Sequence, residues 1–374
     1  MSKALVKAQN PKPKPKRGSI DMPFFVLVML LVAFGLIMVF SASYAYAFYK
    51  YKGDSFYVIR RQFMWTVLGL GAMFFCICAD YKKLKFVSVP ALAGSFFLLV
   101  LVLTPLGTSS NGAQRWLFGF QPSDVMKLAI IIFFSHVISA YPERMRTFRT
   151  GILPFLGILG MVAILLFFEP HMSATILICV TGMVLVFVGG APFMPFGIMG
   201  LMGIGGFAGM IAFLPHARAR MAIWLHPETD PLGDGYQALQ SLYAIGSGGL
   251  TGLGLGQSRQ KYSYIPEPHN DFIFSIVCEE LGFIGALVVL LLFTLLIWRG
   301  ISIALRAQDK FGTLLVVGII TQVALQFILN IAVVTNTIPT TGIALPFFSY
   351  GGTAQVLLLV EMGIVLNVSR YCNK

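Results

Sequence analysis

The chain has 374 residues, of which 57% are hydrophobic and 11% are charged. Its mean hydropathy of +0.81 is far above that of a soluble globular chain, which excludes a soluble protein and indicates several membrane spans. The net charge of +12 arises from 27 Lys and Arg against 15 Asp and Glu. These basic residues do not gather on one soluble face, so the sequence predicts no nucleic-acid partner.

The first 21 residues form a basic segment in which Lys12, Lys14 and Lys16 alternate with prolines. Proline has a fixed φ and no amide hydrogen, so this stretch cannot form a regular helix or sheet. It also lacks an apolar run closed by a cleavage site, as a signal peptide would have. We predict a disordered basic tail that orients the first span and attracts anionic lipid.

Residues 22–374 predict an all-α polytopic membrane domain with ten transmembrane helices. Crossing about 30 Å of hydrocarbon needs roughly 20 apolar residues, and the shorter segments qualify if they lean on neighbouring helices. The predicted spans are 22–47, 62–80, 86–105, 125–141, 151–168, 172–190, 193–215, 272–298, 311–334 and 341–368.

The basic residues sort by side of the membrane. The side that holds both termini carries 17 Lys and Arg in its segments, and the opposite side carries nine, with Lys127 alone inside a span. Because cytoplasmic loops are enriched in Lys and Arg, both termini are predicted to be cytoplasmic. The five cysteines, four of them within spans, indicate neither a disulfide framework nor a zinc site.

The external connection 106–124 contains Arg115 and runs into a span that carries Lys127. Asp124 and Lys127 are three residues apart and share a helix face, so the carboxylate would make the buried cation tolerable. In the structural alternative, Ser123 caps the helix, Asp124 complements its dipole and Lys127 snorkels outward. The residues alone leave both interpretations open.

A long external loop, residues 216–270, separates the seventh and eighth predicted spans. Its 55 residues include enough aromatic and aliphatic side chains to pack on a membrane, so we do not expect disorder. The glycines of GSGGLTGLGLG (246–256) resemble a phosphate cradle only superficially, since no Gly-Lys-Ser/Thr follows and no strand precedes them. Tight turns at the membrane surface are the favoured interpretation.

Glu267, His269 and Asp271 stand together just before the eighth span, where Asp271 is either a helix N-cap or a functional carboxylate. Glu279 and Glu280 lie about 12–14 Å further down the same helix, at a depth where ionised groups normally mark a buried pathway or a paired site. No zinc-binding spacing accompanies these residues. A magnesium or manganese ion near Asp271, shared with a substrate pyrophosphate, remains open.

The stretch TNTIPTTGIALPFFSYGGTA (335–354) is broken by proline and glycine and opens onto the last apolar span. Non-helical backbone at membrane depth is tolerated only where protein or a wet cavity covers it. The stretch therefore predicts an internal polar cavity.

Four stretches together resemble the shape, elongation, division and sporulation (SEDS) family of bacterial membrane proteins, which includes FtsW, RodA and SpoVE. They are GAQRWLFGFQPSDVMKLA (112–129), the Glu-Pro of 169–170, the run 230–285, and IPTTGIALPFFSYGGTA (338–354). The likeness covers nearly the whole chain after the basic tail, and the long external loop is more similar to FtsW and SpoVE than to RodA.

This resemblance implies a peptidoglycan glycosyltransferase that polymerises lipid II by inverting transfer and releases undecaprenyl pyrophosphate. It implies a class B penicillin-binding protein and other division proteins as partners, and a place in the bacterial inner membrane at the division septum. No cofactor is implied with certainty. A transpeptidase is not expected in this chain, because no Ser-x-x-Lys motif accompanied by Lys-Thr-Gly occurs, and cross-linking therefore needs a separate partner.

The essential aspartate of the family falls on Asp271, which we expect to act as general base, with Asn270 in place of the usual threonine. Asp124 stands where Glu is common, His171 and Ser173 where many members have Asp and Gly, and Asn336 where Gly is usual. An outward-facing basic cluster would offset pyrophosphate charge, with or without a divalent ion. Its members would be drawn from Arg218, Arg220, Arg259, Lys261 and Lys127. The candidate substrate-binding residues are Lys127, Asp124, Arg115, Arg218, Arg220, Lys261, Glu267, His269, Gln237, Gln240 and Ser349.

Two alternative functions belong to other classes. A lipid II flippase would use intramembrane polar groups such as Lys127, Glu279 and Glu280. A non-catalytic scaffold for division proteins would explain the spans but not the external acidic and basic residues.

Overall fold

The computed structural model describes residues 18–372 except 111–112, 170, 194–195, 198–199, 201–204, 206–208, 210–214, 234 and 263. Its main elements are α1 (Met22–Lys50), α2 (Tyr57–Cys78), α3 (Leu84–Val102), β1 (Thr108–Ser110), β2 (Ala113–Trp116), α4 (Pro122–Ala140), α5 (Leu153–Phe168), α6 (Met172–Val188), α8 (Pro215–Leu225), α9 (Tyr236–Gly248), α10 (Ile273–Arg306), α11 (Lys310–Val334) and α12 (Gly352–Ser369).

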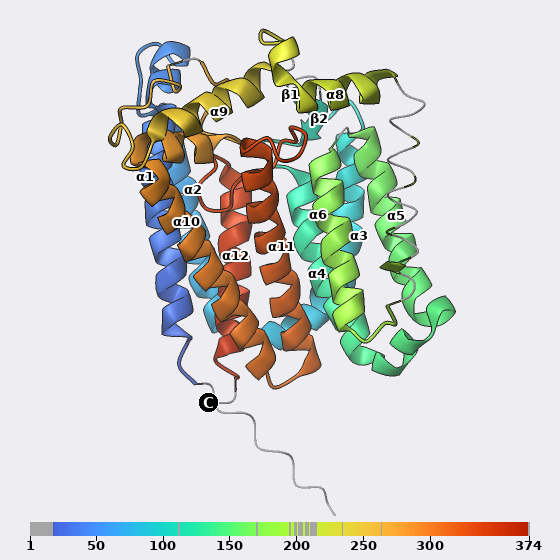
Figure 1. Ribbon diagram of the computed structural model, residues 1–374. Coiled ribbons are helices and arrows are strands. Elements are labelled where there is room, and N and C mark those ends of the chain that lie inside the picture. The colour runs from blue at the N-terminus through green and yellow to red at the C-terminus, as the bar shows by residue number, and fades with distance from the viewer. Residues whose placement is uncertain are drawn as a thin grey trace, which may run out of the picture.

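The fold is a bundle of roughly parallel and antiparallel helices (Figure 1). Within the described part of the chain, eight helices are long and apolar enough to cross a membrane: α1, α2, α3 with the turn before it, α4, α5 with the turn before it, α10, α11 and α12. α6 is apolar but has only 17 residues. The predicted class, an all-α membrane protein with many spans, is therefore confirmed, and one short antiparallel hairpin, β1–β2, lies outside the spans.

Local signals explain where these helices begin. The Asp21 carboxylate accepts a hydrogen bond from the Phe24 amide at the start of α1, and Asp309 caps α11 through the Gly312 amide. α4 begins at Pro122, whose fixed φ suits the first helical turn. The structure assigns the N-cap of α4 to Gln121 with no side-chain capping bond, so the prediction that Ser123 caps this helix is wrong.

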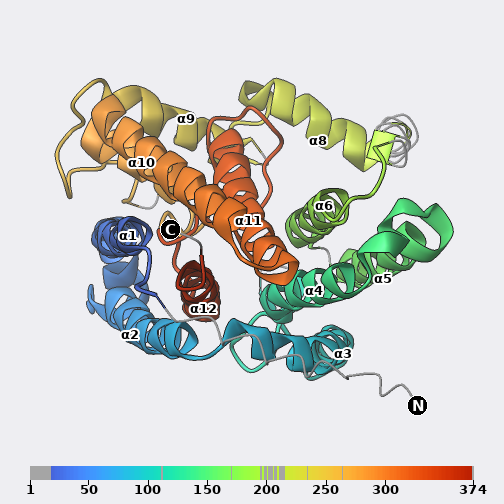
Figure 2. The ribbon, with the colours of Figure 1, turned by 90° about the horizontal axis from the view of Figure 1, so that it is seen from below.

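α12 lies inside a ring formed by α1, α2, α4, α10 and α11 (Figure 2). It approaches α2 closely because glycines face the contact. A Cβ added at Gly363 would lie 2.6 Å from the Met73 carbonyl oxygen, and one at Gly69 would lie 3.2 Å from the Val356 Cα. Small residues thus let these two backbones meet, as is usual between membrane helices.

Both ends of the described chain lie at the same end of the bundle (Figure 1). The Gly18 amide donates to the Arg370 carbonyl at 2.8 Å, and the Asp21 amide donates to Ser369 Oγ at 3.0 Å. Asp21 also forms an ion pair with Arg299, at 2.9 Å. The prediction that both termini share one side agrees with this arrangement, while residues 1–17 of the predicted tail lie outside the described residues.

Much of the seventh predicted span, 193–215, lies outside the described residues. Its two flanks are described and lie at opposite ends of α11. Lys310, at the start of α11, donates to the Gly189 carbonyl at 2.9 Å, whereas Trp224 Nε1 donates at 3.0 Å to the carbonyl of Asn336, just beyond the end of α11. These two described flanks therefore lie at opposite faces of the bundle.

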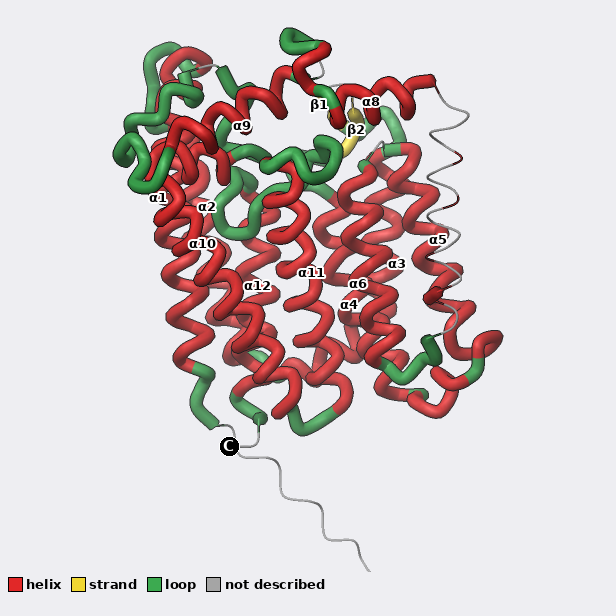
Figure 3. Tube along the Cα trace, viewed as in Figure 1, coloured by secondary structure: helices red, strands yellow, loops and turns green. Residues whose placement is uncertain are grey.

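Two sequence expectations are corrected by the structure. The segment 216–270 is not wholly loop, because α8 and α9 lie across the upper end of the bundle (Figures 1 and 3). The last span begins at Gly352 rather than at 341. Pro346 and a left-handed Phe347, with φ of 66°, keep 341–351 out of a helix, and apolar composition alone could not reveal this.

α10 is interrupted at Gly282, which has a φ of 64°. The glycine-rich turn 248–254 fills this break. The amides of Leu253 and Gly254 donate to the carbonyls of Glu279 and Glu280 at 2.9 and 3.0 Å, and the Phe283 amide donates to the Gly249 carbonyl at 2.9 Å. The tight-turn interpretation of the glycine motif is confirmed, and the turn satisfies the backbone groups that the break releases.

The turn can enter the break only because its contact positions lack side chains. A Cβ at Gly252 would lie 2.2 Å from the Glu280 carbonyl oxygen, and one at Gly248 would lie 2.0 Å from the Cys278 carbonyl oxygen. Gly252 also has a φ of 78°, which disfavours other residues. The glycines thus join the external segment to the upper part of α10.

Candidate active site at the outer end of the bundle

Asp271 lies directly before α10, at the end of the bundle opposite the two termini. The N-cap of α10 is Phe272, so the alternative interpretation of Asp271 as a helix cap is wrong. The Asn330 side-chain amide donates to the carbonyls of Asp271 and Ile343, at 2.7 Å each. These bonds connect α11 to the residues just before α10 and to the non-helical segment 341–351.

The Asp271 carboxylate faces the non-helical segment 341–351. A Cβ added at Gly342 would lie 3.0 Å from Asp271 Oδ2, so the bare backbone of Gly342 passes beside the carboxylate. Asp271 is partly exposed, and no side chain in the described part of the chain donates a hydrogen bond to its carboxylate. This oxygen pair is therefore available to a ligand.

Ser349 and His269 lie near Asp271, where the Ser349 hydroxyl bonds to the backbone and the His269 ring is packed. Ser349 Oγ donates to the Asn270 carbonyl at 2.8 Å and accepts from the Leu345 amide at 2.7 Å. The His269 ring is 3% exposed and packs against the Tyr46 ring at 4.7 Å between centroids. Burial lowers the pKa of His269 to about 4, so this ring is neutral at pH 7.

Glu267 faces the outer end of α1. Its carboxylate accepts from Asn270 Nδ2 at 2.8 Å and from Tyr46 OH at 3.3 Å, and Lys50 Nζ lies 3.9 Å away. Its φ of 46° marks a tight turn. Glu267 thus contributes a negative charge close to Asp271, and its own oxygens already have partners.

Asp271 interacts with a negatively charged group, Glu267, and a positively charged group, Arg115. Burial, followed by the Glu267 charge, raises the pKa of Asp271 to about 6, and Arg115 opposes the rise. Arg115, on β2, is half-buried, and burial lowers the pKa of its guanidinium although Asp271 and Glu169 act in the opposite direction. The structure therefore brings the predicted residues Asp271, Arg115 and Glu267 into one electrostatic cluster.

Glu169 belongs to this cluster and was not among the predicted site residues. Its side chain is fully buried, neither carboxylate oxygen has a hydrogen-bond partner within the described residues, and Arg115 Nε donates to its main-chain carbonyl at 3.3 Å. Burial raises the pKa of Glu169 to about 7, and Arg115 moderates the rise. The Glu-Pro at 169–170 was the available signal in the sequence.

Asp124 and Lys127 form an ion pair of 2.7 Å with side chains only about a tenth exposed. The paired interpretation is confirmed, and Lys127 does not snorkel outward. The pair lines a cavity of about 60 Å³, large enough for a few waters, together with Gln322, Ser349 and Glu361. This finding agrees with the predicted internal polar cavity, and Glu361, which accepts from Gln322 Nε2 at 2.9 Å, was missed by the sequence analysis.

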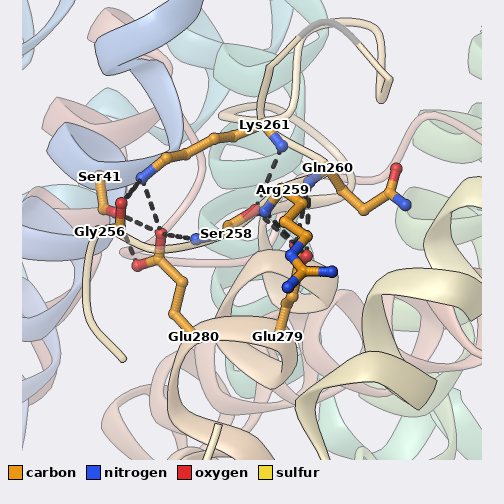
Figure 4. Close-up of polar contacts among 8 residues, drawn as sticks. All are labelled: Ser41, Gly256, Ser258, Arg259, Gln260, Lys261, Glu279 and Glu280. Carbon is orange, nitrogen blue, oxygen red and sulfur yellow. Dashed lines mark hydrogen bonds and ion pairs between the residues drawn. The ribbon is translucent and has the colours of Figure 1, made fainter. Parts of the chain in front are cut away.

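Lys261 lies in a second, separate polar network (Figure 4). Its Nζ is 3.0 Å from Glu280 Oε1 and donates to the Gly256 carbonyl at 2.6 Å, and its side chain is 2% exposed. Ser41 Oγ donates to the same carboxylate at 2.6 Å. Because its charge is paired and enclosed, Lys261 does not stand in the outward-facing basic cluster that we expected.

Glu279 completes this network from the neighbouring position. Its carboxylate accepts from Ser258 Oγ at 2.5 Å and from the Arg259 amide at 2.9 Å. The two adjacent glutamates thus hold the segment 256–261 against α10, and the expectation that they belong to a paired site is confirmed.

The remaining predicted residues lie on the surface helices. Arg218, on α8, is exposed, and Arg220 lies in the same helix with a side chain outside the described part. Gln237 and Gln240, on α9, are partly exposed. α9 packs against α10 and α11, so these four residues lie at the outer end of the bundle, on the same side as Asp271.

The described residues include no group of three His, Cys, Asp or Glu side chains suited to holding a metal ion.

Comparison with known proteins identifies the family. A sequence profile described as "Cell cycle protein", for FtsW, RodA and SpoVE, matches residues 21–374. The chain belongs to the FtsW/RodA/SpoVE family. It is 46% identical over 361 residues to stage V sporulation protein E of Bacillus subtilis, covering 95% of this chain and 98% of that protein.

Other members of the family give the same picture. A probable peptidoglycan glycosyltransferase FtsW of Geobacter sulfurreducens is 37% identical, over 93% of this chain and 95% of that protein. A solved chain described under structural coordination of polymerization and crosslinking by a peptidoglycan synthase complex matches with a TM-score of 0.77 and 28% identity, over 94% of this chain and 98% of that one. Rod shape determining protein RodA of Thermus thermophilus matches with a TM-score of 0.70 and 26% identity, over 95% and 98%.

Two of the departures from the family pattern, Asn336 and His171, have distinct surroundings in the structure. Asn336 has a φ of 54°, a left-handed conformation that Asn tolerates, and its side chain donates to the Trp224 carbonyl at 3.2 Å. His171 is 7% exposed and lies 3.3 Å from Ser123 Oγ, and burial lowers the pKa of His171 to about 3. A neutral, enclosed ring therefore occupies the position where a carboxylate is usual.

Proposed function

We propose that this chain is a peptidoglycan glycosyltransferase that polymerises lipid II into glycan strands and releases undecaprenyl pyrophosphate. The observation that carries the proposal is the partly exposed Asp271 carboxylate at the outer end of the bundle, which accepts no hydrogen bond from the described residues and interacts electrostatically with Arg115. The relatives named FtsW and SpoVE and the match to a peptidoglycan synthase complex support it.

In the proposed reaction, an acceptor sugar hydroxyl attacks the anomeric carbon of the donor. The new carbon–oxygen bond forms as the bond to the pyrophosphate oxygen breaks, and the hydroxyl proton passes to Asp271. A carboxylate with a pKa of about 6 is mostly ionised at pH 7 and still basic enough to accept this proton. A single displacement inverts the anomeric centre, since no covalent glycosyl-enzyme forms.

The leaving pyrophosphate gains negative charge, which Arg115 is placed to offset. The guanidinium is half-buried, where a charge interaction is stronger than in bulk water. Arg218 and Arg220 on α8 are further candidates at the same end of the bundle. A magnesium or manganese ion, which Asp271 could help to hold, would add positive charge for the leaving pyrophosphate, and chelation of a purified sample tests that addition.

The proposed setting is the inner membrane of a bacterial cell, at the division septum, with a class B penicillin-binding protein and other division proteins as partners. The similarity to a synthase complex and to FtsW supports this setting. The chain is proposed to make strands, and the partner to cross-link them.

Labelled lipid II in detergent separates this function from its alternatives. Purified protein, alone and with its penicillin-binding partner, is expected to convert lipid II to polymer although no second leaflet exists. A flippase would move lipid II between the leaflets of vesicles and make no polymer in detergent, and a scaffold would do neither. The absence of polymer in both samples would overturn the proposal.

A further inference from the structure

A second cavity lies at the other end of the bundle from Asp271, between the end of α4 and the start of α5. Its volume is about 190 Å³. The wall is almost wholly apolar. It includes Phe133, Val137, Tyr141, Met145, Phe155 and Ile158.

The linker between the two helices forms the floor of this cavity. It consists of a 3₁₀ turn, Pro142–Arg146, and a π-helical turn, Phe148–Ile152. Gly151 brings the two turns together, because a Cβ there would lie 2.0 Å from the Arg144 carbonyl oxygen. Met145 and Ile152 are buried beneath them, so the linker is packed in place and the cavity is part of the fold.

The linker beside the cavity is positively charged. Arg144 lines the cavity, and Arg146 and Arg149 lie in the same linker. All three are exposed, and Glu143 is the one acidic residue between 142 and 150. The Arg144 guanidinium lies over the Tyr141 ring, 4.4 Å from its centroid, which holds the charge at the mouth. An apolar chamber thus opens beside a cluster of cations at the end of the bundle where the chain termini lie.

We propose that this cavity binds an anionic phospholipid of the surrounding leaflet, with part of an acyl chain in the chamber and the phosphate on the arginines. Both halves of the site match the two halves of such a lipid. Apolar walls favour the hydrocarbon, and basic pockets between membrane helices attract anionic headgroups. The site is independent of Asp271 and of the proposed reaction.

Native mass spectrometry of the detergent-purified full chain tests this site with phosphatidylglycerol, with phosphatidylcholine of the same acyl chains, and with inorganic phosphate. We expect phosphatidylglycerol to bind most tightly, phosphatidylcholine weakly, and phosphate not at all. Each arginine-to-alanine change at 144, 146 or 149 should weaken phosphatidylglycerol binding about fivefold. Lys83→Ala, a basic residue at the same end of the bundle, is the matched control and should leave binding unchanged.

A second variant tests the chamber itself. Val137→Trp places a large ring in the cavity and should reduce binding of both lipids while the melting temperature is retained. Equal binding of the two lipids, equal loss in the Lys83 control, binding of phosphate alone, or full binding by Val137→Trp would each overturn the proposal.

Discussion

Two groups of carboxylates stand within ten residues of each other along the chain and differ in how they are satisfied. Glu279 and Glu280 are buried and receive hydrogen bonds from Ser258, Ser41 and Lys261. Asp271 is partly exposed, and its carboxylate has no hydrogen-bond partner in the described part of the chain. The difference shows that the hydrogen bonds accepted by a carboxylate separate structural acidic residues from those available for chemistry. The sequence alone does not reveal how many such bonds a carboxylate accepts.

The largest expected effect is on stability, at the saturated group. Glu280→Gln leaves Lys261 charged and without its buried partner, so the free energy of unfolding should fall by about 3–5 kcal/mol. Thermal melting in detergent measures the loss. The double variant Glu280→Gln with Lys261→Met removes both charges and should recover much of it, whereas an equal loss in the single and double variants would show that the ion pair is unimportant.

Arg115→Ala should reduce polymerisation by about 10²–10³-fold, because the leaving pyrophosphate loses a preorganised cation. The melting temperature, measured on the same sample, should change far less than in Glu280→Gln. Arg115→Lys keeps the charge without its planar geometry, so its polymerisation rate should lie between those of the unchanged protein and of Arg115→Ala. A rate equal to that of the unchanged protein would remove Arg115 from the site.

Glu279→Gln sharpens the comparison from the structural side. The amide keeps an acceptor for Ser258 and the Arg259 amide but loses the charge, so stability should fall by about 1.5–3 kcal/mol. Polymerisation by the protein that remains folded should be retained. Loss of catalysis with unchanged stability would mean that the second network takes part in chemistry.

The smallest effect concerns pH. Asp271 must be ionised to accept a proton, so kcat/KM should fall about tenfold per pH unit below the raised pKa of about 6. Glu267 raises this pKa, and Glu267→Gln should therefore move the acidic limb to lower pH. Glu169→Gln, which removes a nearby carboxyl with a pKa of about 7, should leave the limb in place. If the acidic limb instead shifted in Glu169→Gln, the titrating group would be Glu169 and not Asp271.

The apolar segments could predict most of the helices, because membrane spans need about 20 apolar residues and lipid leaves few other solutions. Two features of the fold were not predicted from the sequence. The chain at 341–351 is as apolar as a span but turns at Pro346 and Phe347, and the helices α8 and α9 lie in a segment whose glycines suggested only loop.

Within the site, residue type and spacing left the roles of Asp271 and of the pair Asp124–Lys127 open, and the resemblance to the family singled them out. Glu169 and Glu361 were not singled out as site residues, because their contacts join segments far apart in the chain. Arg115 Nε donates to the Glu169 main-chain carbonyl, and Gln322 Nε2 donates to the Glu361 carboxylate. Lys261 was misjudged for the same reason, because its partner Glu280 approaches only after the turn 248–254 enters the break in α10.

Conversion of labelled lipid II by Asp271→Asn tests the central claim most directly. The substitution removes the proton acceptor while keeping the size of the side chain, so we predict a folded protein whose polymerisation is reduced by about 10²–10⁴-fold. Polymer formed at an undiminished rate by a variant with an unchanged melting temperature would contradict the assignment of Asp271 as the general base.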